Sequence, residues 1–262
     1  MKIRFEAEGA RAIDRGDAYY LAAVFLLASL GLASLWSASA GYALSLGKGA
    51  GHFALRQLVF TVPALLVFII AAVAPLDALR ERIMPITLVA LATLFLPLIP
   101  GLGENRNGAS RWIDVGFTTF QPSELWKLVA VFYLAHILDR RAGEGEPGSG
   151  NGGSLAPPLL LCALGCLVVY LQNDFSTAVI IGLASTLMFW IAGAPVSLFL
   201  GLGAAGTALA ALSVLTSDFR LRRILAFVFP AYEPHGQGYQ VLGSIRAIRS
   251  GGFFGKGIAW AR

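Results

Sequence analysis

FSTAVIIGLASTLMFWIAGAPVSLFLGLGAAGTALAALSVLT, residues 175–216, is the stretch that decides the fold class of this chain. It contains no Asp, Glu, Lys or Arg, and Gly193 and Pro195 divide it into two apolar runs. Each run is close to the roughly 20 residues that a helix needs to cross a hydrocarbon core about 30 Å thick. We therefore expect two membrane-spanning helices here, over 175–193 and 196–216.

The rest of the chain has the same character. Of its 262 residues, 56% are hydrophobic and 13% are charged, whereas soluble domains carry about 25% charged residues. So little charge excludes an ordinary soluble globular domain. Apolar runs bounded by Pro, Gly or charged residues predict an all-α, polytopic transmembrane protein with about seven spans. The other five expected spans are 18–40, 53–74, 83–100, 123–138 and 156–173.

Basic residues in the short loops predict the orientation, because they favour the cytoplasmic side. If the spans alternate, three basic pairs fall on one side: Arg11 and Arg15, Arg80 and Arg82, and Arg140 and Arg141. The sequence thus predicts a single transmembrane domain over 1–262 with a cytoplasmic N-terminal segment, 1–17. No small-residue cleavage site follows the basic N-terminus, so the first span is expected to serve as its own insertion signal. Residues 217–262 would begin a large extracytoplasmic loop.

The cysteines and histidines do not form a predicted metal site. Cys162 and Cys166 lie four residues apart in one apolar run without nearby His or carboxylate partners, which favours packing over metal binding. The histidines, His52, His136 and His235, are scattered along the chain. We therefore expect no metal ligands among these residues, and a requirement for a divalent cation stays open.

Residues 101–127, GLGENRNGASRWIDVGFTTFQPSELWK, form a polar loop that runs into the fourth apolar helix. Arg111 beside Trp112 would place a guanidinium next to an amphipathic ring at the membrane surface. Such a pair could bind a phosphate or a sugar, or it could simply anchor the loop. Both interpretations stay open at this point.

The end of this loop, QPSELWK at 121–127, is typical of a helix start. Pro122 fits the first turn, where its missing N–H costs nothing, and Ser123 and Glu124 bring polar and acidic groups to the positive helix end. Glu124 and Lys127 are three residues apart, so they share a helix face and can form an ion pair. That pair either locks the helix to its neighbours or binds substrate directly.

Asp174 lies in LQNDFSTAV, residues 171–179, at the junction of the fifth and sixth spans. It could cap the next helix, because Thr177 follows three residues later. An ionisable residue at a membrane junction is also a candidate functional group. The sequence therefore predicts either a helix cap or a cavity-lining carboxylate.

The C-terminal stretch 219–262 carries many cations on the predicted outer side, among them Arg222, Arg246 and Lys256. An anionic, lipid-linked pyrophosphate would suit such residues, and glycines near Lys256 would let backbone amides approach a phosphate. Phospholipid headgroups are the alternative ligand. The glycine spacing does not match a Walker loop, so nucleotide chemistry is not indicated. We also expect no nucleic-acid partner.

Six motifs together resemble the shape, elongation, division and sporulation (SEDS) family, which includes RodA, FtsW and SpoVE. They occur in the family's order across nearly the whole chain, and a basic stretch at 220–230 is more similar to the FtsW-like division and sporulation branch. Two departures are Asn173 and Ser176, where the family usually has Pro and Gly. The motifs are WSAS (36–39), GASRW (108–112), QPSELWK (121–127), NDFSTA (173–178), GQGYQ (236–240) and SGGFFGKG (250–257).

The resemblance implies a peptidoglycan glycosyltransferase that polymerises lipid II at the outer face of the bacterial plasma membrane for cell division or cell shape. It also implies membrane lipids, a class B penicillin-binding protein and the division or elongation machinery as partners. A lipid II transporter and a non-catalytic scaffold are the alternatives. The substrate-binding residues that we expect are Arg111, Trp112, Gln121, Ser123, Glu124, Lys127, Asp174, Arg222, Arg246 and Lys256.

Family members have about ten spans, and their proposed catalytic Asp follows the SGG..GKG motif. The resemblance therefore leads us to expect that the carboxylate lies beyond Arg262 and that the chain is incomplete at its C-terminus. No catalytic residue is assigned within the 262 residues, and the chain is expected to be inactive alone.

Overall fold

The computed structural model describes residues 15–106, 109–116, 118–144, 155–231, 236, 238–253 and 255. The chain divides into two compact units. One unit is Ala74–Ser217, and the other combines Met1–Val73 with Asp218–Arg262. The site described below lies wholly within Ala74–Ser217.

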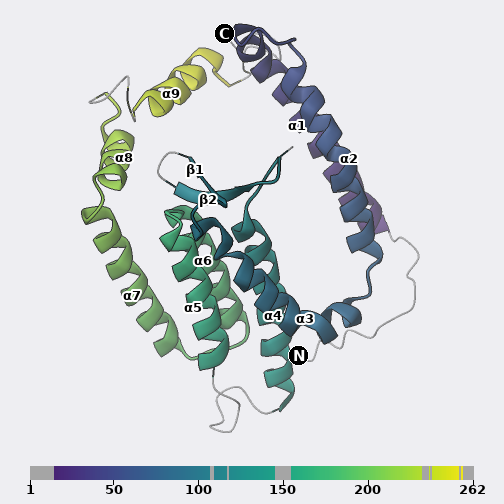
Figure 1. Ribbon diagram of the computed structural model, residues 1–262, viewed down its shortest axis with the longest axis vertical. Coiled ribbons are helices and arrows are strands. Elements are labelled where there is room, and N and C mark those ends of the chain that lie inside the picture. The colour runs from purple at the N-terminus through teal and green to yellow at the C-terminus, as the bar shows by residue number, and fades with distance from the viewer. Residues whose placement is uncertain are drawn as a thin grey trace. The chain divides into compact units, whose positions relative to one another are not determined.

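The unit that holds both chain ends contains two long helices and two short ones. The long helices α1 and α2 pack against each other as an antiparallel hairpin (Figure 1). The indole of Trp36 in α1 lies against Gly51, at the turn between them. The four helices are α1 (Arg15–Ser45), α2 (His52–Val73), α8 (Asp218–Val228) and α9 (Tyr239–Gly251).

The second unit is a helical bundle with a small sheet. Helix α3 packs on α4, α5 packs on α6, and α4 contacts both α5 and α6 (Figure 1). Trp126 of α4 is fully buried and lies against Gly165 of α5, so that a side chain at this glycine would collide with the indole ring. The helices are α3 (Leu76–Thr93), the 3₁₀ turn η1 (Leu96–Leu98), α4 (Pro122–Glu144), α5 (Ala156–Leu171), α6 (Phe175–Ile191) and α7 (Val196–Leu215).

Three short antiparallel strands lie between η1 and α4: β1 (Gly103–Arg106), β2 (Ala109–Asp114) and β3 (Thr119–Phe120). The central strand β2 contacts both η1 and α4. Gly103 fits closely over the carbonyl of Pro97 in η1, where a side chain would have no room. The sheet is therefore fixed to the helix ends rather than standing free.

The structure confirms the all-α polytopic class, because each of the seven expected spans overlaps one of the helices α1–α7. The third, expected over 83–100, begins earlier, because α3 is Leu76–Thr93. Helix α4 begins at Pro122, as the sequence predicts. By length and apolarity, four helical segments within the described residues qualify as candidate spans: Asp17–Ser45, His52–Val73, Leu76–Leu98 and Val196–Leu215. Helices α5 and α6 are apolar but shorter, with 16 and 17 residues.

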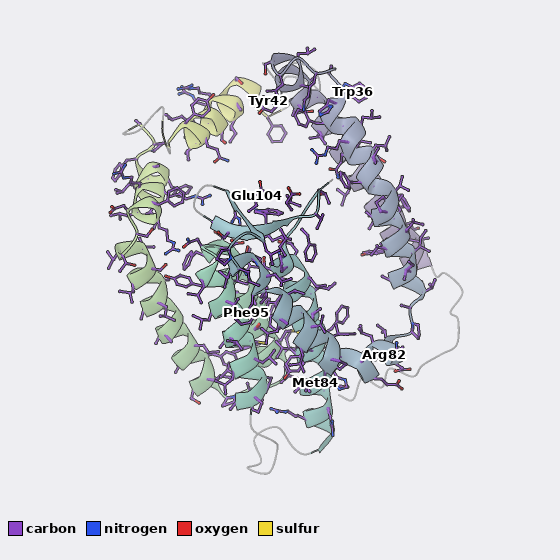
Figure 2. All side chains as sticks on the ribbon, in the orientation of Figure 1. Trp36, Tyr42, Arg82, Met84, Phe95 and Glu104 are labelled. Atoms are coloured by element: carbon purple, nitrogen blue, oxygen red, sulfur yellow. The ribbon has the colours of Figure 1, made fainter. Side chains whose placement is uncertain are left out.

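Two features were missed by the sequence patterns. The strands β1–β3 occupy a segment that the sequence predicts only as a loop, and the stretch after residue 217 contains the helices α8 and α9. Neither feature changes the fold class. Large apolar side chains are exposed along α1, including Trp36 and Tyr42 (Figure 2), as expected of a surface that faces lipid rather than water.

Candidate functional site

Asp174 occupies the N-terminus of α6, directly after the turn that ends α5. Its neighbour Asn173 has a positive φ of 60°, a conformation that Asn tolerates better than most residues. One carboxylate oxygen of Asp174, Oδ1, accepts a hydrogen bond from the backbone N–H of Thr177 at 3.4 Å. The predicted N-cap is therefore confirmed, and the cap is buried, with the residue 3% exposed.

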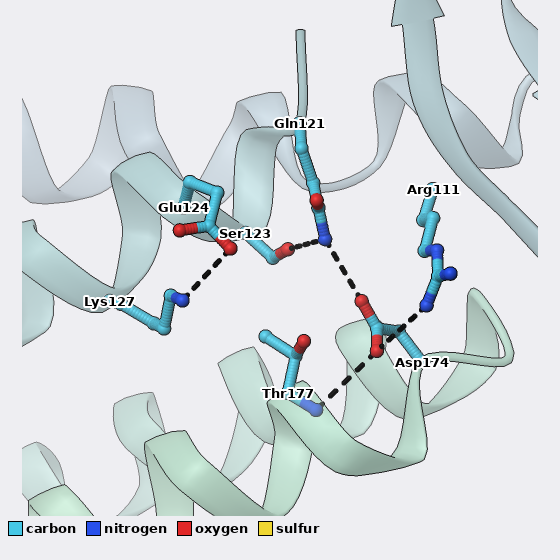
Figure 3. A network of polar contacts seen from close by, with 7 residues as sticks. All are labelled: Arg111, Gln121, Ser123, Glu124, Lys127, Asp174 and Thr177. Carbon is cyan, nitrogen blue, oxygen red and sulfur yellow. Dashed lines mark hydrogen bonds and ion pairs between the residues drawn. The ribbon is translucent and has the colours of Figure 1, made fainter. Parts of the chain in front are cut away.

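The buried carboxylate also pairs with Arg111 of β2. Nη1 of Arg111 lies 3.2 Å from Oδ1 of Asp174, and the arginine side chain is 37% exposed (Figure 3). The pair joins the sheet to the bundle. Nε of Arg111 is buried and has no hydrogen-bond partner within the described part of the chain. A ligand oxygen or a water molecule would satisfy this donor, because an unpaired buried N–H is costly.

Gln121 supplies the third contact with the carboxylate. Its Nε2 donates to Oδ2 of Asp174 at 3.0 Å and to Oγ of Ser123 at 2.9 Å (Figure 3). Ser123 is fully buried in the first turn of α4, next to Pro122. The amide therefore links the start of α4 to the start of α6.

Several donors converge on the buried carboxylate of Asp174. An isolated carboxylate is expensive to bury, and it persists only when it is paired and hydrogen-bonded. Here an arginine, a side-chain amide and a helix N-terminus all contact it. The positive end of the α6 dipole adds to their effect. Both carboxylate oxygens have partners, so the arrangement suits holding neighbouring groups in place.

Glu124 and Lys127 form the ion pair that their spacing predicts, with 2.8 Å between Oε1 and Nζ. The two side chains are 58% and 30% exposed, respectively. Figure 3 shows the pair on the helix that also carries Ser123, near the Asp174 cluster. The site therefore combines a buried, structured network with an accessible pair of opposite charges.

The remaining expected residues are distributed differently. Trp112 lies beside Arg111 on β2, opposite Glu104 of β1, and is half-buried. Arg222 and Arg246 are exposed on α8 and α9, in the other unit. Lys256 lies outside the described residues. A contact of these three cations with substrate stays a prediction.

The sequence analysis missed Gln172, which is buried beside the site. Its Nε2 donates at 2.6 Å to the carbonyl of Leu94, the residue that ends α3. The bond ties the end of α3 to the turn that precedes Asp174. An amide within an apolar run, two residues before a buried acid, is the signal that would have drawn attention to it.

No metal site is evident in the part of the chain that the structure describes. No three His, Cys, Asp or Glu side chains there lie close enough to hold an ion together. Cys162 is buried and Cys166 is half-buried, both as free thiols in the α5 segment. Divalent cation binding by this chain therefore has no candidate ligands among these residues.

Comparison with characterised sequences identifies relatives along almost the whole chain. One is a probable peptidoglycan glycosyltransferase FtsW from Geobacter sulfurreducens, 31% identical over 248 residues, which are 95% of this chain and 66% of the relative. Another is the protein of the same name from Tolumonas auensis, 33% identical over 94% of this chain and 61% of the relative. The chain thus spans just under two thirds of the length of these relatives.

Solved structures match the same region. A chain from a study titled "Structural coordination of polymerization and crosslinking by a peptidoglycan synthase complex" is 29% identical, with a TM-score of 0.68. The match covers 92% of this chain and 67% of that one. Rod shape determining protein RodA from Thermus thermophilus is 25% identical, with a TM-score of 0.61 over 93% of this chain and 76% of RodA.

The family profile FtsW/RodA/SpoVE, described as "Cell cycle protein", matches residues 17–262. Together with the apolar helices, this match makes the chain a multi-pass membrane protein. The protein therefore belongs to the FtsW/RodA/SpoVE family, the SEDS family that its six motifs resemble, and among the relatives named above it is FtsW-like.

Proposed function

We propose that this chain provides the outer substrate site of a peptidoglycan glycosyltransferase that polymerises lipid II during cell division. The names of its relatives, probable peptidoglycan glycosyltransferases, support this activity. The proposed location is the bacterial plasma membrane, with the N-terminus in the cytoplasm. The site and residues 217–262 then face outward, where lipid-linked cell-wall precursors are polymerised.

The observation that carries the proposal is the convergence of three motif segments on one carboxylate. Arg111, Gln121 and Asp174 come from separate motifs, and they meet where α4 and α6 begin. The network fixes the guanidinium of Arg111 while leaving part of its side chain exposed and its Nε without a hydrogen-bond partner among the described residues. A fixed guanidinium with free donors is well suited to a phosphate, which it can bind through two N–H groups.

The chemistry assigns different tasks to the polar residues. Polymerisation requires a general base that removes a proton from a sugar hydroxyl, and cations that stabilise the departing lipid pyrophosphate. We assign Arg111 and Lys127 to the pyrophosphate, and contacts of Arg246 and Lys256 with substrate stay predictions from the sequence. Asp174 holds Arg111 in place. The base is assigned to no residue of this chain.

A class B penicillin-binding protein is the proposed partner. One structural relative comes from a peptidoglycan synthase complex in which polymerization and crosslinking are coordinated, as its title states. Crosslinking follows polymerisation in the assembly of a cell wall, so a crosslinking partner suits the proposed activity.

The proposal is tested with the purified 262-residue protein in vesicles and fluorescent lipid II, with and without the partner. We expect saturable binding of lipid II, and a loss of at least about tenfold in affinity for Lys127→Ala and for Arg111→Ala, as for lost charge-assisted contacts. The matched control is Arg82→Ala, which removes an exposed arginine from the first turns of α3 (Figure 2) and should leave binding unchanged.

Three outcomes would contradict the proposal. Equal losses for Arg82→Ala and Lys127→Ala would show that the affinity depends only on net charge. Passage of lipid II across the vesicle membrane without polymer would favour a transporter. Recruitment of the partner without any lipid II binding would favour a scaffold.

A further inference from the structure

Helix α8, Asp218–Val228, carries an exposed apolar stripe. Leu221, Ile224, Leu225 and Val228 follow the spacing i, i+3, i+4 and i+7, which places them on one face of a helix. Their exposed fractions lie between 38% and 56%. Ala226 is buried, at 5% exposure, and lies about 150° around the axis from the centre of the stripe. The stripe is therefore not covered by the described part of the chain.

The position of α8 in the chain limits what can cover the stripe. Helix α7 is a candidate membrane span that ends at Leu215, and only Thr216 and Ser217 separate it from Asp218. Two residues cannot carry the chain far from the surface where a span ends. With 11 residues, α8 is about 16 Å long, too short to cross the hydrocarbon core itself. Helix α8 therefore begins near the membrane surface at which α7 ends, and an apolar stripe on a short helix there contacts the bilayer surface.

Arginines complete the pattern. Arg222 is exposed at one border of the stripe, about 60° from Leu225, and Arg223 is exposed on the polar side. Arginine side chains reach to headgroup level while their alkyl stems cover apolar surface. Helices that lie in the membrane plane combine an apolar face with Lys or Arg on the polar face. The charge of α8 is complementary to the phosphates of anionic lipids.

We propose that α8 is an interfacial helix whose stripe lies at the acyl boundary of the membrane and whose arginines bind anionic phospholipid headgroups. The sequence left two ligands open for Arg222, a lipid-linked pyrophosphate and a phospholipid headgroup. The proposal assigns Arg222 to the phosphate of a phospholipid headgroup. The inference requires only that α7 spans the membrane, so it can fail or succeed independently of the proposed enzymatic activity.

The test measures the depth of single nitroxide labels in the full chain. Cys162 and Cys166 are replaced by Ala, and labels are attached to Ile224→Cys on the stripe and to Arg223→Cys on the polar side. Leu225→Cys is the second stripe position, should the first variant fold poorly. Accessibility to oxygen and to a neutral nickel chelate is measured in phosphatidylcholine vesicles, with and without phosphatidylglycerol. Lipid II is absent.

We expect the label at 224 to be accessible to oxygen and shielded from nickel, and the label at 223 to show the reverse. Phosphatidylglycerol should increase the shielding at 224. In the Ile224→Cys protein, replacing Arg222 and Arg223 with Gln should remove that increase, since each arginine near an anionic surface shifts the equilibrium about fivefold.

Each alternative gives a distinct result that overturns the proposal. Free access of nickel to the label at 224 would place the stripe in water. Low access to both reagents would show that a protein surface covers the stripe. If phosphatidylglycerol has no effect and added lipid II alone shields the label, Arg222 belongs to the substrate site instead.

Discussion

Asp174 is the residue on which the site depends most, because it caps α6, pairs with Arg111 and accepts from Gln121. Asp174→Ala removes the cap and leaves the Arg111 guanidinium without its buried partner. Breaking such a pair typically costs about 3–5 kcal/mol. We expect a large loss of thermal stability in detergent. Tryptophan fluorescence during heating measures this loss. Asp174→Asn should lose less, because Asn also caps helices.

A double-mutant cycle checks the reason for that loss. If the ion pair accounts for it, Arg111→Ala should cost little more in a protein that already carries Asp174→Ala. Fully additive losses of stability would mean that the two residues act separately, which is incompatible with the 3.2 Å contact between them.

Glu124 and Lys127 permit a test of whether an ion pair is structural or binds substrate. The pair is partly exposed, and exposed i, i+3 pairs contribute only about 0.2–0.5 kcal/mol to stability. Lys127→Gln should therefore change the melting temperature little but weaken lipid II binding at least about tenfold, because Lys127 is assigned to the pyrophosphate. Asp77→Asn, which breaks the exposed i, i+3 pair with Arg80, is the matched control. A large stability loss with unchanged binding would instead favour a purely structural pair.

Among contacts between single residues, only those between neighbours in the sequence could be predicted. The cap from Asp174 to Thr177 and the pair of Glu124 with Lys127 both follow from helix periodicity over three residues. The bond from Gln121 to Asp174 joins positions 53 residues apart, and it depends on how α4 and α6 pack. No local pattern contains that information, so the network had to come from the structure.

Among the elements, the contact between α4 and α5 has a sharp steric requirement. A Cβ at Gly165 would overlap the buried indole of Trp126. We expect Gly165→Ala to destabilise the protein by about 1–3 kcal/mol, the usual cost of overpacking a core. Gly182→Ala in α6 is the control, because its Cβ would meet only Sγ of Cys166, at 3.9 Å.

The control should be neutral or slightly stabilising, because Ala favours a helix over Gly by up to about 1 kcal/mol. Thermal unfolding of both variants in the same detergent measures the difference. If Gly165→Ala were as stable as Gly182→Ala, the close approach of α4 and α5 would be wrong.

The helices were predictable as elements because apolar runs of span length have few alternatives in a membrane protein. The strands were not, since β1 reads GENR and β3 has only two residues. Their stability derives from contacts with η1, where Gly103 lies against Pro97, rather than from strand propensity. The amphipathic helix α8 was also not predicted, because the stretch was interpreted by its arginines alone. The helical spacing of its apolar residues was not considered.

For the whole molecule, the number of spans determines which segments share a side of the membrane. Four expected spans, α4 to α7, and the short helix α8 separate the sheet from α9, so Asp114 and Arg249 should face the same side if each of the four spans crosses. Asp139, near the end of α4, should then face the opposite side. All three residues are exposed. Counting only the four longest apolar segments would leave one crossing, α7, between the sheet and α9 and would place them on opposite sides.

Labelling of intact cells distinguishes these topologies. Single cysteines at positions 114, 139 and 249, in a chain with Cys162 and Cys166 replaced by Ala, are treated with a membrane-impermeant maleimide. We expect Asp114→Cys and Arg249→Cys to react from outside, and Asp139→Cys to react only after permeabilisation, because α5 and α6 cross despite their 16 and 17 residues. If 139 reacts only after permeabilisation, labelling of 114 but not 249 from outside would mean that one or all three of α5, α6 and α7 do not cross, and the proposed outward position of α8 would fail with it.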